Sequence, residues 1–150
     1  MSAFTERIDA DLIAARRRRD DLAVRTLGLL KSELVTAAKE PGAGVLDEEA
    51  AMRVVRRELK RRQEAAEAFA AAGREESARS ERKEGELLSA YLPAEMDEAE
   101  LEREVRAVVT QLGATSPRDM GSVMKAARER LAGKAEQGRI AAIARRLLAG

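Results

Sequence analysis

Apolar residues recur every three or four positions along almost the whole chain, and this spacing limits the fold more than any other feature. Ile8, Leu12 and Ala15 fall on one helix face, and a second set has the same spacing: Ala23, Leu27, Leu30, Leu34 and Ala37. A helix places such positions in one stripe, whereas a half-buried strand needs alternation. Aromatic residues make up only 2% of the chain, which also disfavours sheets. The sequence therefore predicts an all-α protein.

Capping residues and breakers divide the pattern into separate helices. Asp20 and Asp47 are N-cap residues for the second and third helices, Gly73 is a C-terminal stop, and Pro93 ends the fourth helix. The third helix carries a seam typical of coiled coils, at Met52, Val55, Leu59, Ala66 and Phe69. Arg62 occupies the slot between Leu59 and Ala66 and interrupts this seam. Long helices are thus expected before Pro93.

Shorter helices with clear end signals follow Pro93. Asp97 and Glu100 have capping-box spacing, Ser116 and Asp119 repeat it, and Gly133 is a stop. Apolar faces occur at Leu101, Val105, Val108, Val109 and Leu112, at Met120, Val123, Met124, Ala127 and Leu131, and at Ile140, Ile143, Leu147 and Leu148. The expected architecture is an elongated N-terminal helical domain over residues 1–93 and a compact three-helix domain over residues 94–150.

Several function classes lack the residues that they need. The chain has no Cys and no His, so thiolate chemistry, Cys-type zinc sites and the usual general base are missing. We assign no catalytic residue, no metal site and no cofactor, and a free-standing enzyme ranks last among the alternatives. No apolar run is long enough for a membrane span, and the N-terminus lacks the apolar core of a secretory signal. The expectation is a soluble cytoplasmic protein.

Local charge differs from the nearly neutral total of +1. Residues 117–150 hold 8 bases and 3 acids, a net charge of +5, whereas residues 95–116 carry a net charge of −4. This basic segment is either a solvated surface or a surface that neutralises nucleic-acid phosphates, and charge alone favours the first. The stripe of Arg53, Arg57, Lys60 and Arg61 is interpreted as a solvated face, with Glu64 and Glu67 at pairing distance, and the Arg16–Arg19 run is interpreted in the same way.

Specific motifs occur on both sides of Pro93. They are Arg56-Arg57-Glu58-Leu59-Lys60-Arg61-Arg62, Phe69-x3-Gly73-Arg74, Ala90-Tyr91-Leu92-Pro93, Asp97-Glu98-x-Glu100-Leu101, Gly113-Ala114, Asp119-Met120-Gly121-x-Val123-Met124-Lys125 and Gly133-Lys134-Ala135. Together they resemble the GatB/YqeY family over essentially the whole chain, and the segment from Asp119 to Lys125 is the most specific of them. The family usually has Gly-[Lys/Arg]-Ala-Asp-Gly where this chain has Glu136 and Gln137 after Ala135. Glutamate is a poorer helix cap than aspartate.

The resemblance implies a function in binding. Such proteins are similar to the C-terminal part of the B subunit of the glutamine-dependent tRNA amidotransferase, a carbon–nitrogen ligase whose tail domain grips tRNA. The expected partner is therefore tRNA or a related structured RNA, with a tRNA-using enzyme as a further partner. The expected RNA-binding residues are Gly121, Lys125, Arg128, Gly133, Lys134 and Arg139. The glycines have a second interpretation as helix stops or tight helix crossings. The alternative function is a protein–protein adaptor whose long helices over residues 48–92 form the working surface.

Overall fold

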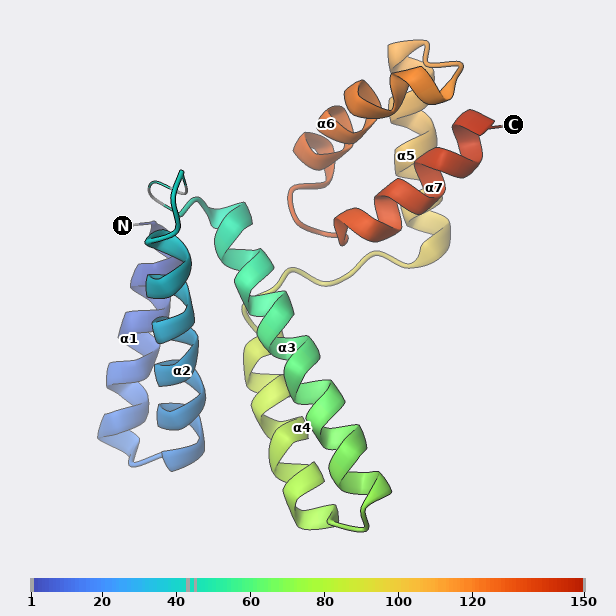
Figure 1. The fold of residues 1–150 in the computed structure, drawn as a ribbon. Helices are drawn as coiled ribbons and strands as arrows, with labels where there is room; N and C mark the ends of the chain where they lie inside the picture. The colour runs from blue at the N-terminus through green and yellow to red at the C-terminus, as the bar shows by residue number, and fades with distance from the viewer. Residues whose placement is uncertain (1, 43, 45, 150) are drawn as a thin grey trace. The chain divides into compact units, whose positions relative to one another are not determined.

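A computed structural model of the chain describes residues 2–42, 44 and 46–149, and the regular structure in these residues is helical (Figure 1). The elements are α1 (Ala3–Arg18), α2 (Asp21–Ala38), α3 (Glu48–Ala71), α4 (Glu75–Ser89), α5 (Glu98–Leu112), a 3-10 turn η1 (Pro117–Asp119), α6 (Met120–Leu131) and α7 (Gln137–Ala149). The all-α prediction is confirmed. Contacts within the chain group it into two compact units, Met1–Leu92 and Pro93–Gly150.

The capping residues named from the sequence begin the helices. The Asp20 carboxylate accepts the Ala23 N–H at 3.1 Å, and the Asp47 carboxylate accepts the Ala50 N–H at 2.8 Å. Asp97 caps α5 in the same way. Each of these bonds satisfies a donor that the first turn of a helix leaves unpaired. Gly73 follows α3 with a φ of +77°, a left-handed conformation that glycine adopts without the penalty of a Cβ atom.

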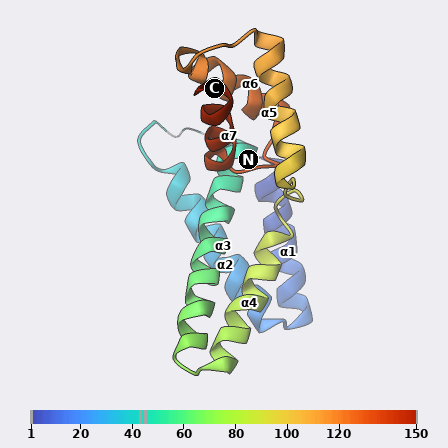
Figure 2. The ribbon, with the colours of Figure 1, turned by 90° about the vertical axis from the view of Figure 1, so that its right-hand side faces the viewer.

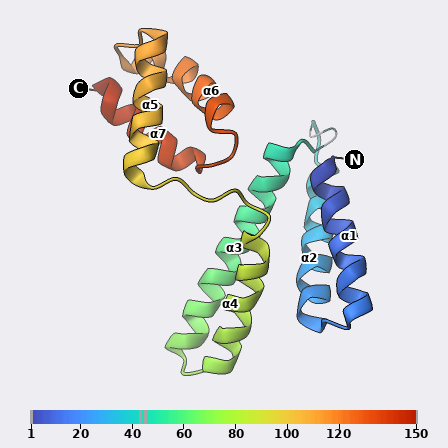
Figure 3. The same cartoon turned by 180° about the vertical axis from the view of Figure 1, so that it is seen from behind.

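The first unit is built from two helical hairpins, α1–α2 and α3–α4. In all three views α3 and α4 lie side by side, and they run in opposite directions (Figures 1, 2 and 3). The hairpins share one apolar core, which contains Phe4, Ile8, Leu12, Leu27, Leu30, Leu34, Met52, Val55, Leu88 and Tyr91. Most of these residues belong to the faces that the helical spacing predicted. Ile13, Leu29 and Val35 are large apolar residues that remain exposed.

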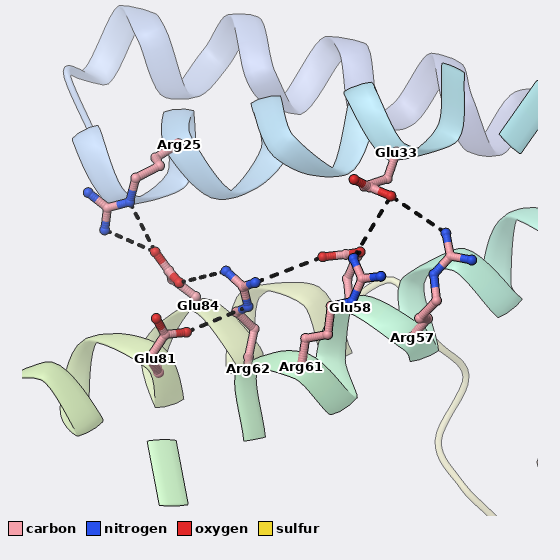
Figure 4. A network of polar contacts seen from close by, with 8 residues as sticks. All are labelled: Arg25, Glu33, Arg57, Glu58, Arg61, Arg62, Glu81 and Glu84. Carbon is pink, nitrogen blue, oxygen red and sulfur yellow. Dashed lines mark hydrogen bonds and ion pairs between the residues drawn. The ribbon is translucent and has the colours of Figure 1, made fainter. Parts of the chain in front are cut away.

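The interruption of the α3 seam at Arg62 has a structural cause. Its guanidinium lies 3.4 Å from a Glu84 oxygen, 3.5 Å from a Glu81 oxygen and 4.0 Å from a Glu58 oxygen. Figure 4 shows these groups within a network of eight charged residues from α2, α3 and α4: Arg25, Glu33, Arg57, Glu58, Arg61, Arg62, Glu81 and Glu84. We call this network the ionic junction. The acids and bases of the junction balance, which is the usual condition for burying charge between helices.

The second unit packs α5, α6 and α7 around a separate apolar core. Its buried residues include Leu101, Val105, Val108, Val123, Ala127, Leu131, Ile140, Ile143 and Leu148. The helix predicted from Ser116 begins with the 3-10 turn η1, and an Asp119 oxygen accepts the N–H groups of Thr115 and Ser116. Leu112 was expected on the apolar face, but 47% of it is exposed at the end of α5. The expectation for Leu112 was wrong because the helix ends there, at Gly113.

Candidate nucleic-acid interface

The basic segment of the second unit is partly neutralised by α5. Three of its eight bases form ion pairs with acids of that helix: Arg130 with Glu104 at 2.6 Å, Arg146 with Glu102 at 3.0 Å and Arg139 with Glu98 at 3.1 Å. Within the described residues the other five bases have no ion-pair partner: Arg118, Lys125, Arg128, Lys134 and Arg145. All five are exposed. The structure thus separates the bases that bind α5 from those that face solvent.

Gly121, Lys125 and Arg128 form one exposed stripe of α6. Their spacing of four and three residues places them on one face, and the buried residues Val123 and Ala127 belong to the opposite face. A Cβ atom at Gly121 would have no heavy atom within 4 Å. The interpretation of Gly121 as a tight helix crossing within the chain is therefore wrong. An open helix surface between free bases can admit the close approach of another backbone.

The loop between α6 and α7 holds Lys134 in a fixed backbone position. Ala132 and Gly133 both have positive φ, at 45° and 82°, so the chain turns sharply after α6. The Lys134 N–H donates to the Leu131 carbonyl at 2.9 Å, and the Lys134 carbonyl accepts the Met96 N–H at 3.2 Å. Gly133 is thus part of a helix stop, as one of its two interpretations proposed. Its backbone presents an exposed lysine beside the end of α6.

Arg139 is engaged with the segment that leads into α5. Its Nη2 atom donates to the Met96 carbonyl at 3.0 Å and to Glu98 at 3.1 Å, and Nη1 lies 3.9 Å from Glu95. Only 28% of its side chain is exposed. Arg139 and Lys134 therefore both contact Met96, one through a side chain and the other through the backbone. Among the expected RNA-binding bases, Arg139 alone is committed to carboxylates.

Arg118 and Arg145 are free bases that the sequence interpretation did not include. Neither residue has an acid three or four positions away in the sequence, so no helical neighbour can neutralise it. Arg128 also has no acid three or four positions away, and it is among the RNA-binding residues expected from the sequence. This spacing rule is the signal that could have identified all three. It would not have identified the pairing of Arg130 or Arg146, because their partners come from a different helix.

The basic stripe of α3 is largely occupied by ion pairs. Arg57 lies 3.6 Å and Arg61 4.0 Å from Glu33 of α2, and Arg61 also lies 2.7 Å from Glu58. Arg53 pairs with Glu49 at 3.4 Å. The expected pairing with Glu64 and Glu67 does not occur among the described ion pairs. Arg57 and Arg61 pair instead with acids of α2 and α3. Much of this stripe belongs to the ionic junction and is not a free cationic face.

Two further features of the described chain bear on function. In the described residues, no three side chains among His, Cys, Asp and Glu come together as a metal site would require. No helix of the described chain combines the length and the apolar character that a membrane span requires.

The family model described as Yqey-like protein matches residues 5–148 of the chain. This match spans nearly the whole sequence, and the chain belongs to that family. No curated protein matches the chain.

Proposed function

We propose that the second unit of this Yqey-like protein binds the phosphate backbone of a structured RNA, with tRNA as the first candidate. The observation that carries the proposal is the set of five exposed bases, on η1, α6, α7 and the loop between the last two, that have no ion-pair partner in the described part of the chain. The choice of tRNA comes from the resemblance to the tail of the amidotransferase B subunit. The expected contacts are Lys125, Arg128 and Lys134, with Arg118 and Arg145 added from the structure.

Binding of this kind depends on charge and shape. Each base that neutralises a phosphate releases a condensed counterion, so affinity falls steeply as salt rises. The chain has only two Phe, one Tyr and no Trp, so it lacks the aromatic platforms on which unpaired bases stack. Gly121 leaves room for an RNA backbone to approach α6 closely, and Gly133 orients the loop that carries Lys134. Recognition through backbone and shape is therefore the proposed mode.

In this proposal, Arg139 and the partner enzyme have supporting functions. Arg139 positions the loop around Lys134 through its contacts with Met96 and Glu98. The chain is proposed to bind RNA without catalysing a reaction, because it contains neither His, the most common general base, nor Cys, a common nucleophile. Any amidotransferase activity then belongs to an enzyme that uses the bound tRNA. The corresponding expectation is that the purified chain releases no ammonia from glutamine.

A filter-binding titration with a tRNA mixture at several salt concentrations tests the proposal. The variant Lys125→Ala/Arg128→Ala/Lys134→Ala removes three proposed phosphate contacts. It should lower the slope of log affinity against log salt by roughly two units, because each contact contributes about 0.7–0.9. The matched control is Arg79→Gln/Arg82→Gln/Lys83→Gln, which removes three exposed bases of α4 that have no described ion pair. The control should bind as the wild type does.

Two results would contradict the proposal. One is a wild-type chain that fails to hold tRNA at low salt, and the other is an equal loss in the variant and its control. The adaptor alternative predicts no tRNA retention at physiological salt. It also predicts that substitutions on the α3 stripe, at Arg53 for example, weaken the capture of a protein partner.

A further inference from the structure

The turn that joins α1 to α2 (Figure 1) carries four consecutive arginines, Arg16–Arg19. Arg16, Arg17 and Arg19 are exposed, and within the described residues none of them has an ion-pair partner. Arg18 lies 3.4 Å from Asp20, whose carboxylate also caps α2. The Asp20 carboxylate is therefore already engaged, and the neighbouring Asp21 forms no described ion pair with these arginines. Three unneutralised arginines thus remain within four consecutive positions.

Most other arginines of this unit have described partners. Six form ion pairs with acids: Arg7, Arg25, Arg53, Arg57, Arg61 and Arg62. Arg74 lies over the Phe69 ring, with its guanidinium carbon 5.0 Å from the ring centroid. A partnered arginine is thus the common arrangement in this unit. The α1–α2 turn departs from it at three positions, and Arg79 and Arg82 of α4 likewise have no described ion pair or ring contact.

The folding of α1 accounts for only part of this cluster. Bases in the last turn of a helix are favoured by the helix dipole, which applies to Arg16 and Arg17. Arg19 lies beyond the helix in a left-handed conformation with φ of 58°, which is unfavourable for a residue with a Cβ atom. Adjacent like charges also repel each other. A glycine or asparagine at position 19 would suit the backbone better.

The same backbone feature occurs beside the free lysine of the second unit. Among the described residues, Arg19 and Ala132 are the two non-glycine positions with positive φ. Ala132 lies two residues before Lys134, in the loop that belongs to the proposed RNA site. Both residues are helix C-caps in the left-handed conformation that commonly ends a helix, a position where glycine is the usual residue. The two turns therefore share both free bases and an unfavourable backbone.

We propose that the α1–α2 turn is a second phosphate-binding surface, which contacts RNA through Arg16, Arg17 and Arg19. The choice of RNA as the polyanion rests on the proposed function of the second unit. The planar guanidinium group donates paired hydrogen bonds that match phosphate oxygens. A second set of free bases raises the number of phosphates that the protein neutralises, which steepens the salt dependence of binding.

The test compares three variants of the full chain in the tRNA titration. Arg16→Gln/Arg17→Gln/Arg19→Gln removes the three free positive charges of the turn and keeps the Arg18–Asp20 pair. Arg79→Gln/Arg82→Gln/Lys83→Gln removes the same charge elsewhere in the same unit, and Lys125→Ala/Arg128→Ala/Lys134→Ala removes the site of the second unit. The turn variant should lower the salt slope by roughly two units, about 0.7–0.9 for each contact. The α4 variant should leave the slope unchanged. Fluorescence of Tyr91, the single tyrosine of the chain, confirms that the first unit is folded.

The outcomes distinguish this proposal from the preceding one. Loss in the turn variant alone supports the turn and contradicts the site of the second unit, whereas loss in the second-unit variant alone does the reverse. Equal loss in the turn and α4 variants shows an unspecific charge effect and overturns the proposal. Retention of the wild type on phosphatidylserine vesicles and not on tRNA overturns both proposals and replaces RNA with a membrane surface.

Discussion

At the scale of single residues, partners decide what a charged side chain of this protein can do. Arg139 and Lys125 both belong to the basic segment after Pro117. Arg139 is held by Glu98, Glu95 and the Met96 carbonyl, while Lys125 has no ion pair within the described chain. The first can position a loop, and the second is available to an anionic ligand. The net charge of a segment does not distinguish the two cases.

Gly121 provides a prediction in which stability and binding change in opposite directions. Glycine destabilises a helix by about 0.5–1 kcal/mol relative to alanine, and a Cβ atom here would meet no neighbour. Gly121→Ala should therefore stabilise the second unit by up to about 1 kcal/mol and weaken tRNA binding, because the methyl group occupies the approach to α6. Urea unfolding followed by circular dichroism and a filter-binding titration measure the two effects.

Gly28→Ala is the control for this prediction. Gly28 is also helical, on α2, and a Cβ atom there would likewise have no heavy atom within 4 Å. This variant should stabilise the first unit and leave tRNA binding unchanged. If Gly121→Ala binds tRNA as tightly as the wild type, no RNA backbone approaches α6 at that position.

Glu81 gives the first unit a component of stability that depends on pH. Burial raises the pKa of Glu81 above its usual 4.5, and the nearby Glu84 carboxylate adds to this, while Arg62 acts against it. Because the folded state binds the proton more tightly, this contribution is fully present below about pH 4.5 and is lost as pH rises through the folded pKa. Glu81→Gln should therefore unfold at higher urea than the wild type near pH 7, with a smaller difference near pH 4.5. An unchanged difference across this range would contradict the assignment.

At the scale of elements, Arg62 links α3 to α4 through the ionic junction. Arg62→Leu removes one positive charge that neutralises the buried carboxylates near it. Glu58 still pairs with Arg61 at 2.7 Å, and Glu84 still pairs with Arg25 at 2.9 Å. The expected loss is therefore about 3 kcal/mol, at the lower end for breaking a buried ion pair. Arg62→Leu/Glu81→Leu should recover much of this loss, because the double variant leaves no carboxylate at position 81 without a positively charged partner. Tyr91 fluorescence during urea unfolding reports on the first unit. Additive effects of the two substitutions would show that these residues are not coupled.

The helices themselves could be predicted from local signals, whereas the pairing of charges could not. Asp20, Asp47 and Asp97 act on N–H groups three residues ahead, so a short stretch of sequence contains the whole interaction. Glu33 pairs with Arg57 from a different helix, and this pairing requires the packing of α2 against α3. The sequence therefore predicted the interruption at Arg62 but not the carboxylates that explain it.

The candidate site also combines features that local sequence predicts with features that depend on the packing of helices. Lys125 and Arg128 lie on one helix, and their spacing alone predicts one exposed stripe. The engagement of Arg139 depends on where Met96 and Glu98 lie after folding, about forty positions earlier in the chain. Gly121 required the structure as well, because only the surrounding atoms show that its surface is open.

At the scale of the whole molecule, the segment between the units should be the first site of proteolysis. The first unit extends to Leu92, and the Met96 backbone is already hydrogen-bonded to Lys134 and Arg139 of the second unit. Residues 93–95 have no described backbone hydrogen bond, and Glu95 is exposed, with a 3.9 Å ion pair to Arg139 as its described contact. Limited digestion with a glutamate-specific protease should cut first after Glu95. Mass spectrometry identifies the fragments, and circular dichroism should show that both remain helical.

Arg139→Lys tests why the protected segment begins at Met96. Lysine keeps the positive charge but has a single nitrogen, whereas the guanidinium contacts the Met96 carbonyl and Glu98 through Nη2 and lies near Glu95 through Nη1. Cleavage should then extend to Glu98, while the salt slope of tRNA binding stays unchanged because no phosphate contact is lost. Arg139→Gln, which removes the charge, should also leave the slope unchanged, and a lower slope in that variant would identify Arg139 as a direct phosphate contact. Initial cleavage near Gly73 would instead show that the turn of the α3–α4 hairpin opens before the segment between the units does.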